Sequence, residues 1–213
     1  MNKKRIARLA LGLVLYAIGI VLTINANLGL APWDALHVGL SQTTGISFGQ
    51  ISIVVGLLVL FINYHLYESI GIGTLLNIFV IGLLIDGIFH YQLIPVSQSI
   101  IGGIPMILAG MLLIALASYF YISAGFGTGP RDGLMVALTR TTEKPVGLIR
   151  GFIEISVLSL GVLLGAKIGL GTVILAFGFG PVIQTTFKLL NFDVSRVTHT
   201  SFLQKSKLKN AVE

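Results

Sequence analysis

Apolar residues in this chain gather into six runs of roughly 20 residues, the length that a helix needs to cross a bilayer. Short polar or glycine-rich segments separate these runs. Two further stretches of about 12 residues, 32–43 and 130–141, are amphipathic and too short to cross. The pattern predicts an all-α polytopic membrane protein with two short helices and six spans, at 9–28, 47–66, 70–90, 104–124, 146–165 and 168–189.

The same pattern occurs twice, at an offset of 98 residues and without a gap. GLAPWDALHVGLSQTTG, which starts at Gly29, aligns with GTGPRDGLMVALTRTTE, which starts at Gly127. Chance similarity between apolar stretches explains matched Leu and Ile, but not matched Pro, Asp and Thr-Thr in register. The chain therefore divides into a first unit at 1–95, a second unit at 96–190 and a basic tail at 191–213, each unit with three spans and one short helix.

Because each unit has an odd number of spans, the second unit should enter the membrane from the side opposite to the first. With the N-terminus in the cytoplasm, Lys167 is the only basic residue expected outside, and all others, Arg131 included, fall on or near the cytoplasmic side. If the short helices also crossed, the chain would have eight spans and the two repeats would be parallel, which we disfavour. We expect six transmembrane helices in a 3+3 inverted-topology repeat, each unit with one broken or re-entrant short helix.

Composition agrees with a membrane protein and narrows its partners. Of the 213 residues 54% are hydrophobic and 10% charged, and the mean hydropathy is +0.94, whereas a soluble domain has roughly 25% charged residues. The net charge of +6 comes largely from basic clusters at the two ends, which suit an anionic cytoplasmic leaflet and not nucleic acid. The apolar run at 9–28 is too long for the core of a signal peptide. The chain has no cysteine, which excludes disulfides and thiolate metal sites.

The most informative motif is Gly-x-x-Pro-x-Asp, which precedes each short helix and contains Gly29, Pro32 and Asp34 in the first unit and Gly127, Pro130 and Asp132 in the second. Proline suits the first turn of a helix, and an acid two residues later can cap the free N–H groups. In the other interpretation, the motif breaks the chain at membrane depth. Broken segments of this kind expose helix ends to a substrate in inverted-repeat transporters.

A second motif, Gly-x-Gly-Thr, opens the third span of each unit, with Gly71 and Gly73 in one and Gly169 and Gly171 in the other. These glycines favour a tight turn and close packing between helices, and a cavity-lining role is the alternative.

Ionisable residues inside spans give a third set of candidates. Asp86 lies deep in its span with Asn77 on a neighbouring face, and its counterpart in the second unit is Gln184. Arg150 and Glu154 are four residues apart, which allows an ion pair within one helix, and in the structural interpretation Arg150 snorkels while Glu154 merely neutralises it. Ionisable groups in a membrane usually face a pathway or the bundle interior, so both acids are candidates for ion coupling or substrate binding.

Other chemistry finds little support in the sequence. The four histidines show no metal-ligand spacing, and no nucleophile–base pair or nucleotide-binding loop appears. We therefore expect no enzyme activity, no metal and no cofactor. Trp33 and Tyr91 fit the aromatic belt of a membrane protein.

Together, APWDALHVGL, GIGT with the Asn and Asp that follow it, GTGPRDGLMVAL, IRGFIE and the GLGT run resemble the YczE/YyaS branch of the YitT-type bacterial membrane proteins. The resemblance covers about residues 9–190. It implies a multi-pass protein of the bacterial inner membrane and supplies no catalytic residue.

From these observations we expect a transporter or permease for an unknown small molecule, with its site at the interface between the units. A membrane scaffold that stabilises or regulates a partner protein is the alternative, and a homo-oligomer is compatible with either. The expected location is the bacterial cytoplasmic membrane, with both termini in the cytoplasm.

Overall fold

The computed structural model describes residues 3–194 and residue 197, and these form eight α-helices. Six of the helices are long and apolar enough to cross a membrane, so the expected all-helical architecture with six candidate spans is confirmed. The basic tail expected at 191–213 lies almost wholly outside the described residues. The helices are α1 (Lys3–Asn25), α2 (Pro32–Thr44), α3 (Phe48–His65), α4 (Ile72–His90), α5 (Ile100–Ala124), α6 (Pro130–Thr142), α7 (Val146–Leu163) and α8 (Leu170–Leu189).

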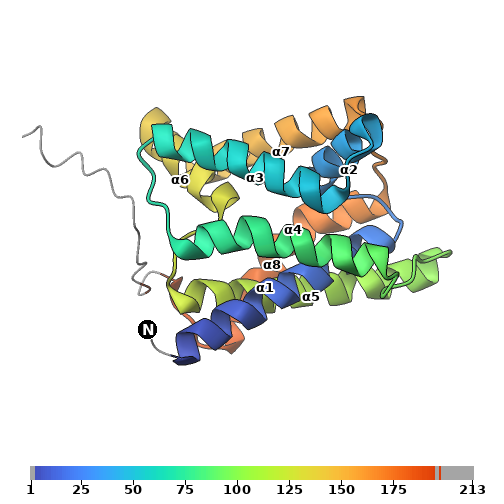
Figure 1. The fold of residues 1–213 in the computed structure, drawn as a ribbon, viewed down its shortest axis with the longest axis horizontal. Coiled ribbons are helices and arrows are strands. Elements are labelled where there is room, and N and C mark those ends of the chain that lie inside the picture. The colour runs from blue at the N-terminus through green and yellow to red at the C-terminus, as the bar shows by residue number, and fades with distance from the viewer. Residues whose placement is uncertain (1–2, 195–196, 198–213) are drawn as a thin grey trace, which may run out of the picture.

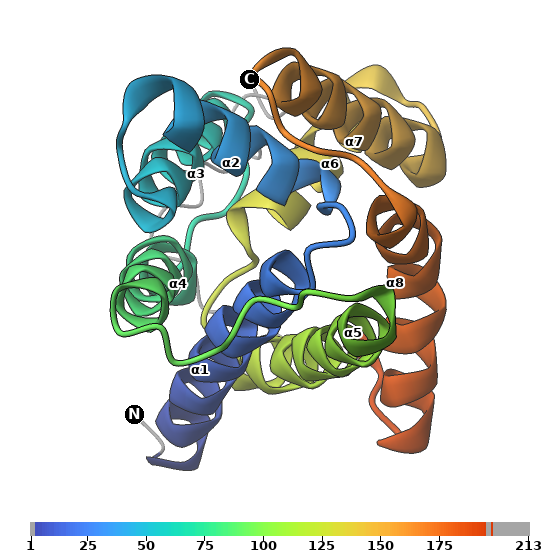
Figure 2. The ribbon, with the colours of Figure 1, turned by 90° about the vertical axis from the view of Figure 1, so that its right-hand side faces the viewer.

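The eight helices form two layers (Figure 1). One layer consists of α1, α4, α5 and α8, where α1 packs on α4 and α5, and α5 packs on α8. The other layer consists of α2, α3, α6 and α7, where α2 packs on α7 and α3 packs on α6. Figure 2 shows the second layer above the first, with α4 and α8 on opposite sides. We call the end of the bundle where α1 begins the N-terminal end, and the other end the far end.

The core of the first layer is a close antiparallel contact between α1 and α5. A Cβ on Gly12 would lie 2.9 Å from the backbone nitrogen of Tyr121, and a Cβ on Gly19 would lie 2.9 Å from the carbonyl oxygen of Gly110. Small residues let membrane helices approach this closely. The helix that opens the first unit is thereby packed against the corresponding helix of the second.

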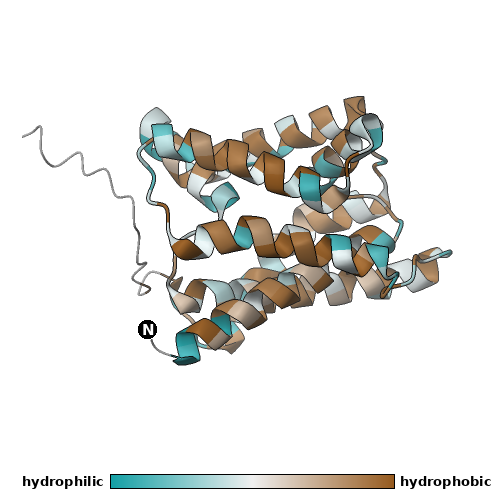
Figure 3. Cartoon of the chain, viewed as in Figure 1, coloured by the Kyte–Doolittle hydropathy of each residue, from teal (hydrophilic) through white to brown (hydrophobic). Residues whose placement is uncertain are grey.

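The outer surface of the long helices is apolar, and hydrophilic residues gather mainly near the ends (Figure 3). Large side chains such as Phe61, Phe152 and Phe177 are 64%, 68% and 79% exposed. Side chains of this size are costly to expose to water, whereas they suit the hydrocarbon region of a bilayer. The surface therefore has the character expected of a membrane protein.

The two short helices have 13 residues each, which gives a length of about 20 Å against a hydrocarbon core of about 30 Å. Pro32 and Pro130 occupy the first turn, where a missing N–H costs nothing. Both helices end in a left-handed residue, Gly45 with φ 73° and Glu143 with φ 56°. The two helices thus begin and end at positions 98 residues apart.

Candidate functional site

Each short helix begins after a chain break that the opposite unit holds in place. The Gly171 N–H donates to the Leu28 carbonyl oxygen at 2.6 Å, and the Gly73 N–H donates to the Phe126 carbonyl oxygen at 2.7 Å. These two contacts occupy equivalent positions in the two units. The Gly-x-Gly-Thr motif of each unit is therefore the dock for the Gly-x-x-Pro break of the other.

The break requires glycine at its sharpest point. Gly29 has φ +114° and Gly127 has φ +125°, values that side chains strongly disfavour. A Cβ on Gly29 would lie 2.5 Å from the backbone nitrogen of Gly169, and one on Gly127 would lie 2.7 Å from Thr74 Oγ1. Thr74 Oγ1 in turn donates to the Thr128 carbonyl oxygen at 2.7 Å. The two helix starts are consequently fixed at the interface between the units.

The first turns of α2 and α6 meet across this interface. Arg131 on α6 places its guanidinium carbon 4.9 Å from the centre of the Trp33 ring on α2, a cation–π distance. Trp33 and Arg131 occupy equivalent positions in the two units. Among the described residues, the guanidinium of Arg131 has neither a hydrogen bond nor an ion pair within 4 Å. Its five donors thus remain available.

The two acids of the motif do not cap their helices. No side chain caps the N-terminus of α2 or α6. Asp34 is 5% exposed, and its carboxylate bonds to none of the described residues, although Arg131 lies within electrostatic range. Burial raises the pKa of Asp34 above its ordinary value, and the positive charge of Arg131 opposes this shift. Asp132 is exposed, so the two equivalent acids have different access to solvent.

His37 lies one turn after Asp34 on the same face of α2. It is 1% exposed, and neither ring nitrogen has a hydrogen-bond partner in the described part of the chain. Its ring packs edge-on against Phe48, with centroids 5.4 Å apart. A buried polar group without a partner costs about 1–3 kcal/mol, so such groups are rare outside functional sites.

Further polar groups surround the two helix starts. The Asn63 side-chain N–H donates to the Pro130 carbonyl oxygen at 2.8 Å, while its oxygen Oδ1 is buried and has no partner among the described residues. The Tyr16 hydroxyl shares a 2.7 Å hydrogen bond with Ser118 Oγ, and its ring lies edge-on to Tyr121. The site at the start of α2 and α6, which we call the central site, is thus polar and only partly satisfied.

Comparison with known proteins now gives the family. Residues 3–188 match the model of a family described as a family of unknown function (DUF6198). This chain belongs to that family.

Its relatives carry the same broad description. The chain is 36% identical over 193 residues to the Uncharacterized membrane protein YczE of Bacillus subtilis, covering 88% of this chain and 89% of the relative. It is 34% identical over 199 residues to an Uncharacterized protein of Haemophilus influenzae, covering 93% and 88%. It is 27% identical over 187 residues to the Uncharacterized protein YyaS of Bacillus subtilis, covering 83% and 92%. No solved structure matches. The resemblance to the YczE/YyaS group is confirmed.

In this DUF6198 chain, Asp86 serves the end of a helix. Its carboxylate accepts hydrogen bonds from the Ser47 hydroxyl and from the Gly49 N–H, the latter at 2.7 Å. Ser47 is the N-cap of α3 and also accepts from the Gln50 N–H at 3.3 Å. Asp86 therefore joins α4 to the beginning of α3, at the far end of the bundle and apart from the central site.

The other predicted charges lie on α7. Arg150 and Glu154 form the expected pair within one helix, with Nε and Oε1 2.9 Å apart. Arg150 also lies within electrostatic range of Asp132, which brings the pair to the edge of the central site. Asn77 is half-buried and Gln184 is exposed, and the side chain of neither has a hydrogen bond to the described residues.

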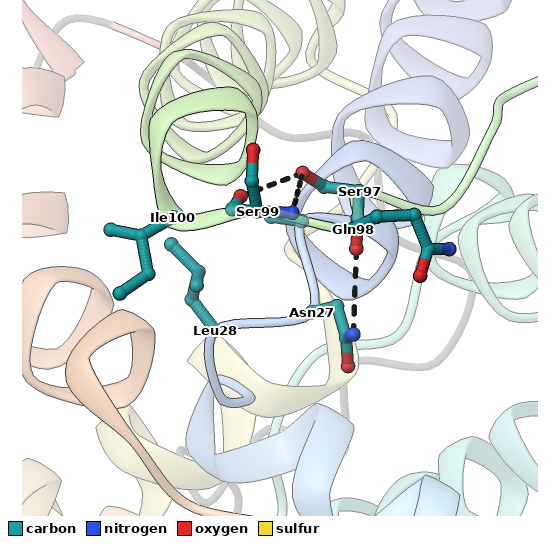
Figure 4. Close-up of a pocket in the computed structure, with 7 residues that line it drawn as sticks. Asn27, Leu28, Ser97, Gln98, Ser99 and Ile100 are labelled. Carbon is teal, nitrogen blue, oxygen red and sulfur yellow. Dashed lines mark hydrogen bonds between the residues drawn. The ribbon is translucent and has the colours of Figure 1, made fainter.

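A small cavity lies elsewhere, at the far end, where the segment between the units crosses the end of α1 (Figure 4). It has a volume of about 170 Å³ and is lined by residues 26–28 and 97–100. The Ser97 N–H donates to the Asn25 carbonyl oxygen at 2.7 Å, and Asn25 Nδ2 donates to the Ile94 carbonyl oxygen at 2.7 Å. This cavity is part of the connection between the units and is separate from the central site.

Two sequence interpretations change with these positions. Trp33, assigned to the aromatic belt, instead lies against Arg131 at the interface between the units. Arg131, counted with the cytoplasmic charges, lies at the same interface and not at an end of the bundle. His37 and Tyr16 carried no motif that would have singled them out. The sequence did hold one indication for Trp33 and Arg131, because the two residues occupy equivalent positions of the repeated motif.

Proposed function

We propose that the protein is a small-solute permease of the bacterial cytoplasmic membrane, built as a 3+3 inverted-topology repeat. The equivalent helices α1 and α5 run antiparallel, as two units inserted with opposite orientation would. The start of α1, the end of α6, the start of α7 and the end of α8 lie at the N-terminal end (Figure 1), and these segments carry Lys3, Lys4, Arg140, Lys144 and Lys188. The connection from α7 to α8, which carries Lys167, lies at the far end. The positive-inside rule then makes the N-terminal end cytoplasmic.

The central site is the proposed binding site. Helix N-termini carry partial positive charge and free N–H groups, and half-helices use them to bind anionic groups of substrates in other inverted-repeat transporters. Here two such N-termini meet, and Arg131 adds a planar set of donors suited to a carboxylate or phosphate.

The acids restrict the class of solute. Asp34 is buried within electrostatic range of Arg131 and would repel a simple anion, while Asp132 lies on the equivalent turn. A solute that carries both a negative and a positive group satisfies Arg131 and an acid at once. We therefore propose a small zwitterionic solute, with its anionic group at Arg131 and its cationic group at Asp34 or Asp132.

One observation carries the proposal: a buried, unpaired set of polar groups at the meeting point of two half-helices. Asp34 and His37 are 5% and 1% exposed, and the carboxylate and ring bond to no described residue. A scaffold protein gains nothing from such groups, since an apolar interior would be more stable. A bound solute would supply the missing partners.

Uptake into proteoliposomes tests the function. The purified protein would be offered a mixture of amino acids, betaines, organic acids, sugars and inorganic ions, and the vesicle contents analysed by mass spectrometry. We expect accumulation of a zwitterion by the wild type and its loss in Asp34→Asn and Arg131→Gln. Lys188→Gln, an exposed change near the end of α8, is the matched control and should behave as wild type.

The alternative role gives a different result. A scaffold would accumulate no solute from the mixture in wild type or variants. Equal accumulation by wild type, Asp34→Asn and Arg131→Gln would instead remove the central site from the pathway and sink this proposal.

A further inference from the structure

The two units differ in how their second and third spans meet. In the first unit α3 packs closely on α4. A Cβ on Gly49 would lie 2.1 Å from the Gly82 carbonyl oxygen, and a Cβ on Gly82 would lie 2.7 Å from the Gly49 carbonyl oxygen. The two backbones are therefore in direct contact, and the hydrogen bonds from Ser47 and Gly49 to Asp86 hold the same end. We call this contact the first glycine gate.

The equivalent contact in the second unit is absent. Gly147 and Gly180 occupy the positions equivalent to Gly49 and Gly82, both are exposed, and a Cβ on either would meet nothing within 4 Å. Gln184, the counterpart of Asp86, is exposed as well. Although α7 and α8 are consecutive, they are not among the helix pairs that pack extensively in the described chain. We call Gly147 and Gly180 the second glycine gate.

The two acids of the central site, Asp34 and Asp132, also differ between the units. Asp34, in the unit whose gate is closed, is 5% exposed, whereas Asp132, in the unit whose gate is open, is exposed. The unit whose glycine pair makes no contact is thus also the unit whose acid is exposed. Because α7 begins and α8 ends at the N-terminal end, the missing contact lies toward that end.

Gly147 and Gly180 contact nothing in this conformation, as do the helical glycines Gly87 and Gly151, but only Gly147 and Gly180 have counterparts that pack on one another in the other unit. Glycine inside a helix lowers its stability, and the usual compensation in a membrane protein is close helix packing. Gly147 and Gly180 have no such packing here, while their counterparts do. This difference between equivalent glycine pairs is the observation from which we infer a second conformation.

We propose that the two glycine gates close in alternation. The described conformation has the first gate closed and the second open; in the opposite conformation Gly147 packs on Gly180, and Gly49 leaves Gly82. The layer formed by α2, α3, α6 and α7 rocks over the layer formed by α1, α4, α5 and α8. This inference rests on the proposed permease, because it names the movement by which that site gains access to each side.

Contacts within the moving layer support a rocking movement. A Cβ on Gly161 of α7 would lie 2.5 Å from the Ala35 carbonyl carbon of α2. Asn63 of α3 is bonded to Pro130 of α6, at the equivalent interface. These tight contacts tie each short helix to a span of the other unit, so the four helices move together.

Distance measurements test the proposal directly. The native chain has no cysteine, so spin labels attach only to cysteines that are introduced. One pair, Ile46→Cys with His90→Cys, reports on the first gate, and the other, Lys144→Cys with Lys188→Cys, reports on the second. All four positions are exposed and the pairs are equivalent. In proteoliposomes we expect a short and a long distance for each pair, with opposite proportions. A single long distance at 144–188 in every condition, with or without the zwitterion mixture, would overturn the proposal.

A small substitution should lock the second gate open. A Cβ on Gly147 meets nothing here, so Gly147→Ala should fold with wild-type thermal stability. In the opposite conformation that Cβ would strike the Gly180 backbone, as the first gate indicates. We expect the short population at 144–188 and the uptake both to fall by about tenfold or more.

Gly151→Ala is the matched control. Its Cβ also meets nothing here, but its counterpart is Ile53, whose side chain packs against Gly82 in the closed first gate. Closure therefore tolerates a side chain at this position, and distances and uptake should match the wild type. If Gly147→Ala behaves like Gly151→Ala, the second gate does not close.

The two proposals fail in different ways. Alternating distances without uptake of any solute would support the gates and remove the permease. The opposite result is uptake of a solute by both wild type and Gly147→Ala, together with a single unchanging distance between labels at 144 and 188. That result would support the permease and overturn the gates.

Discussion

At the scale of single residues, the unusual feature is a set of polar groups left without partners at the start of α2 and α6. The ring of His37 is 1% exposed and unbonded among the described residues, and Asn63 Oδ1 is in the same state. Each such group costs about 1–3 kcal/mol when no partner replaces water. That cost identifies the central site more clearly than the charges that first drew attention in the sequence.

His37→Leu separates binding from stability. Leucine has a similar volume and no polar atom, so it should fill the place beside Phe48 and raise the unfolding free energy by up to about 1–3 kcal/mol. Uptake of the zwitterion should fall, because the ring nitrogens would be partners of the bound solute. Unfolding in detergent and uptake in proteoliposomes are the two measurements. Lower stability together with normal uptake would show that the ring has a structural partner instead.

Residues of the central site show how far the sequence could be taken. The repeated Gly-x-x-Pro-x-Asp motif identified Asp34 and Asp132, because Pro and Asp in register are informative in an apolar chain. His37 was not predicted, since a single histidine on a short helix has no pattern. Arg131 looked like a cytoplasmic charge because charge counting uses order along the chain and cannot detect that a short helix begins inside the bundle.

At the scale of helices and breaks, the two repeated motifs explain one another. Gly-x-Gly-Thr was interpreted as a packing turn or a cavity lining, and the structure shows that it docks the break of the opposite unit through Gly73 and Gly171. Sequence alone could not give that partner, because the contact joins segments more than half a unit apart. It follows that the geometry of the short helices depends on both units being present.

Gly29→Ala tests this docking. The substitution puts a Cβ 2.5 Å from the Gly169 backbone nitrogen at φ +114°, so both strain and a clash apply, and we expect a loss of about 3 kcal/mol or more. Gly45→Ala is the control, since Gly45 has φ +73° and nothing within 4 Å, and should cost only about 1 kcal/mol. Equal losses in the two variants, measured by unfolding in detergent, would show that the docking contact adds nothing.

Asp86→Asn tests whether this acid holds a helix or couples an ion. Hydrogen bonds to a charged group contribute about 1.5–3 kcal/mol, and the Ser47 and Gly49 donors would lose the charge. We expect that loss in the unfolding free energy, with the pH dependence of uptake unchanged. Glu154→Gln is the comparison, because its exposed pair with Arg150 contributes only about 0.3–0.5 kcal/mol. A changed pH dependence in Asp86→Asn with normal stability would restore the coupling hypothesis.

At the scale of the whole molecule, the helices were predictable and their asymmetry was not. Hydropathy and the 98-residue offset gave six spans and two short helices, because run length and glycine–proline breaks are local properties. The difference between the α3–α4 contact and the α7–α8 opening was not accessible in this way. The two glycine pairs occupy equivalent positions in the sequence, and only the structure shows that Gly49 and Gly82 are in contact whereas Gly147 and Gly180 are not.

The side of the membrane on which each end of the bundle lies can be measured directly. Because the native chain has no cysteine, single cysteines can report the side of each end: Thr43→Cys and Gln98→Cys at the far end, Lys144→Cys and Lys188→Cys at the N-terminal end. In intact cells a membrane-impermeant maleimide should label the first two and reach the last two only after permeabilisation. The physical reason is the concentration of Lys and Arg at the N-terminal end.

The first pair decides between the possible topologies. If α2 and α6 also crossed the membrane, Thr43→Cys after α2 and Gln98→Cys after α4 would both lie inside and would be protected in intact cells. With 13 residues each, these helices span only about 20 Å and do not reach across a core of about 30 Å. Protection of Thr43→Cys and Gln98→Cys in intact cells would therefore remove the inverted repeat. Labelling of both positions together with protection of Lys144→Cys would place the two central helix starts between two oppositely inserted units, as transport through the central site requires.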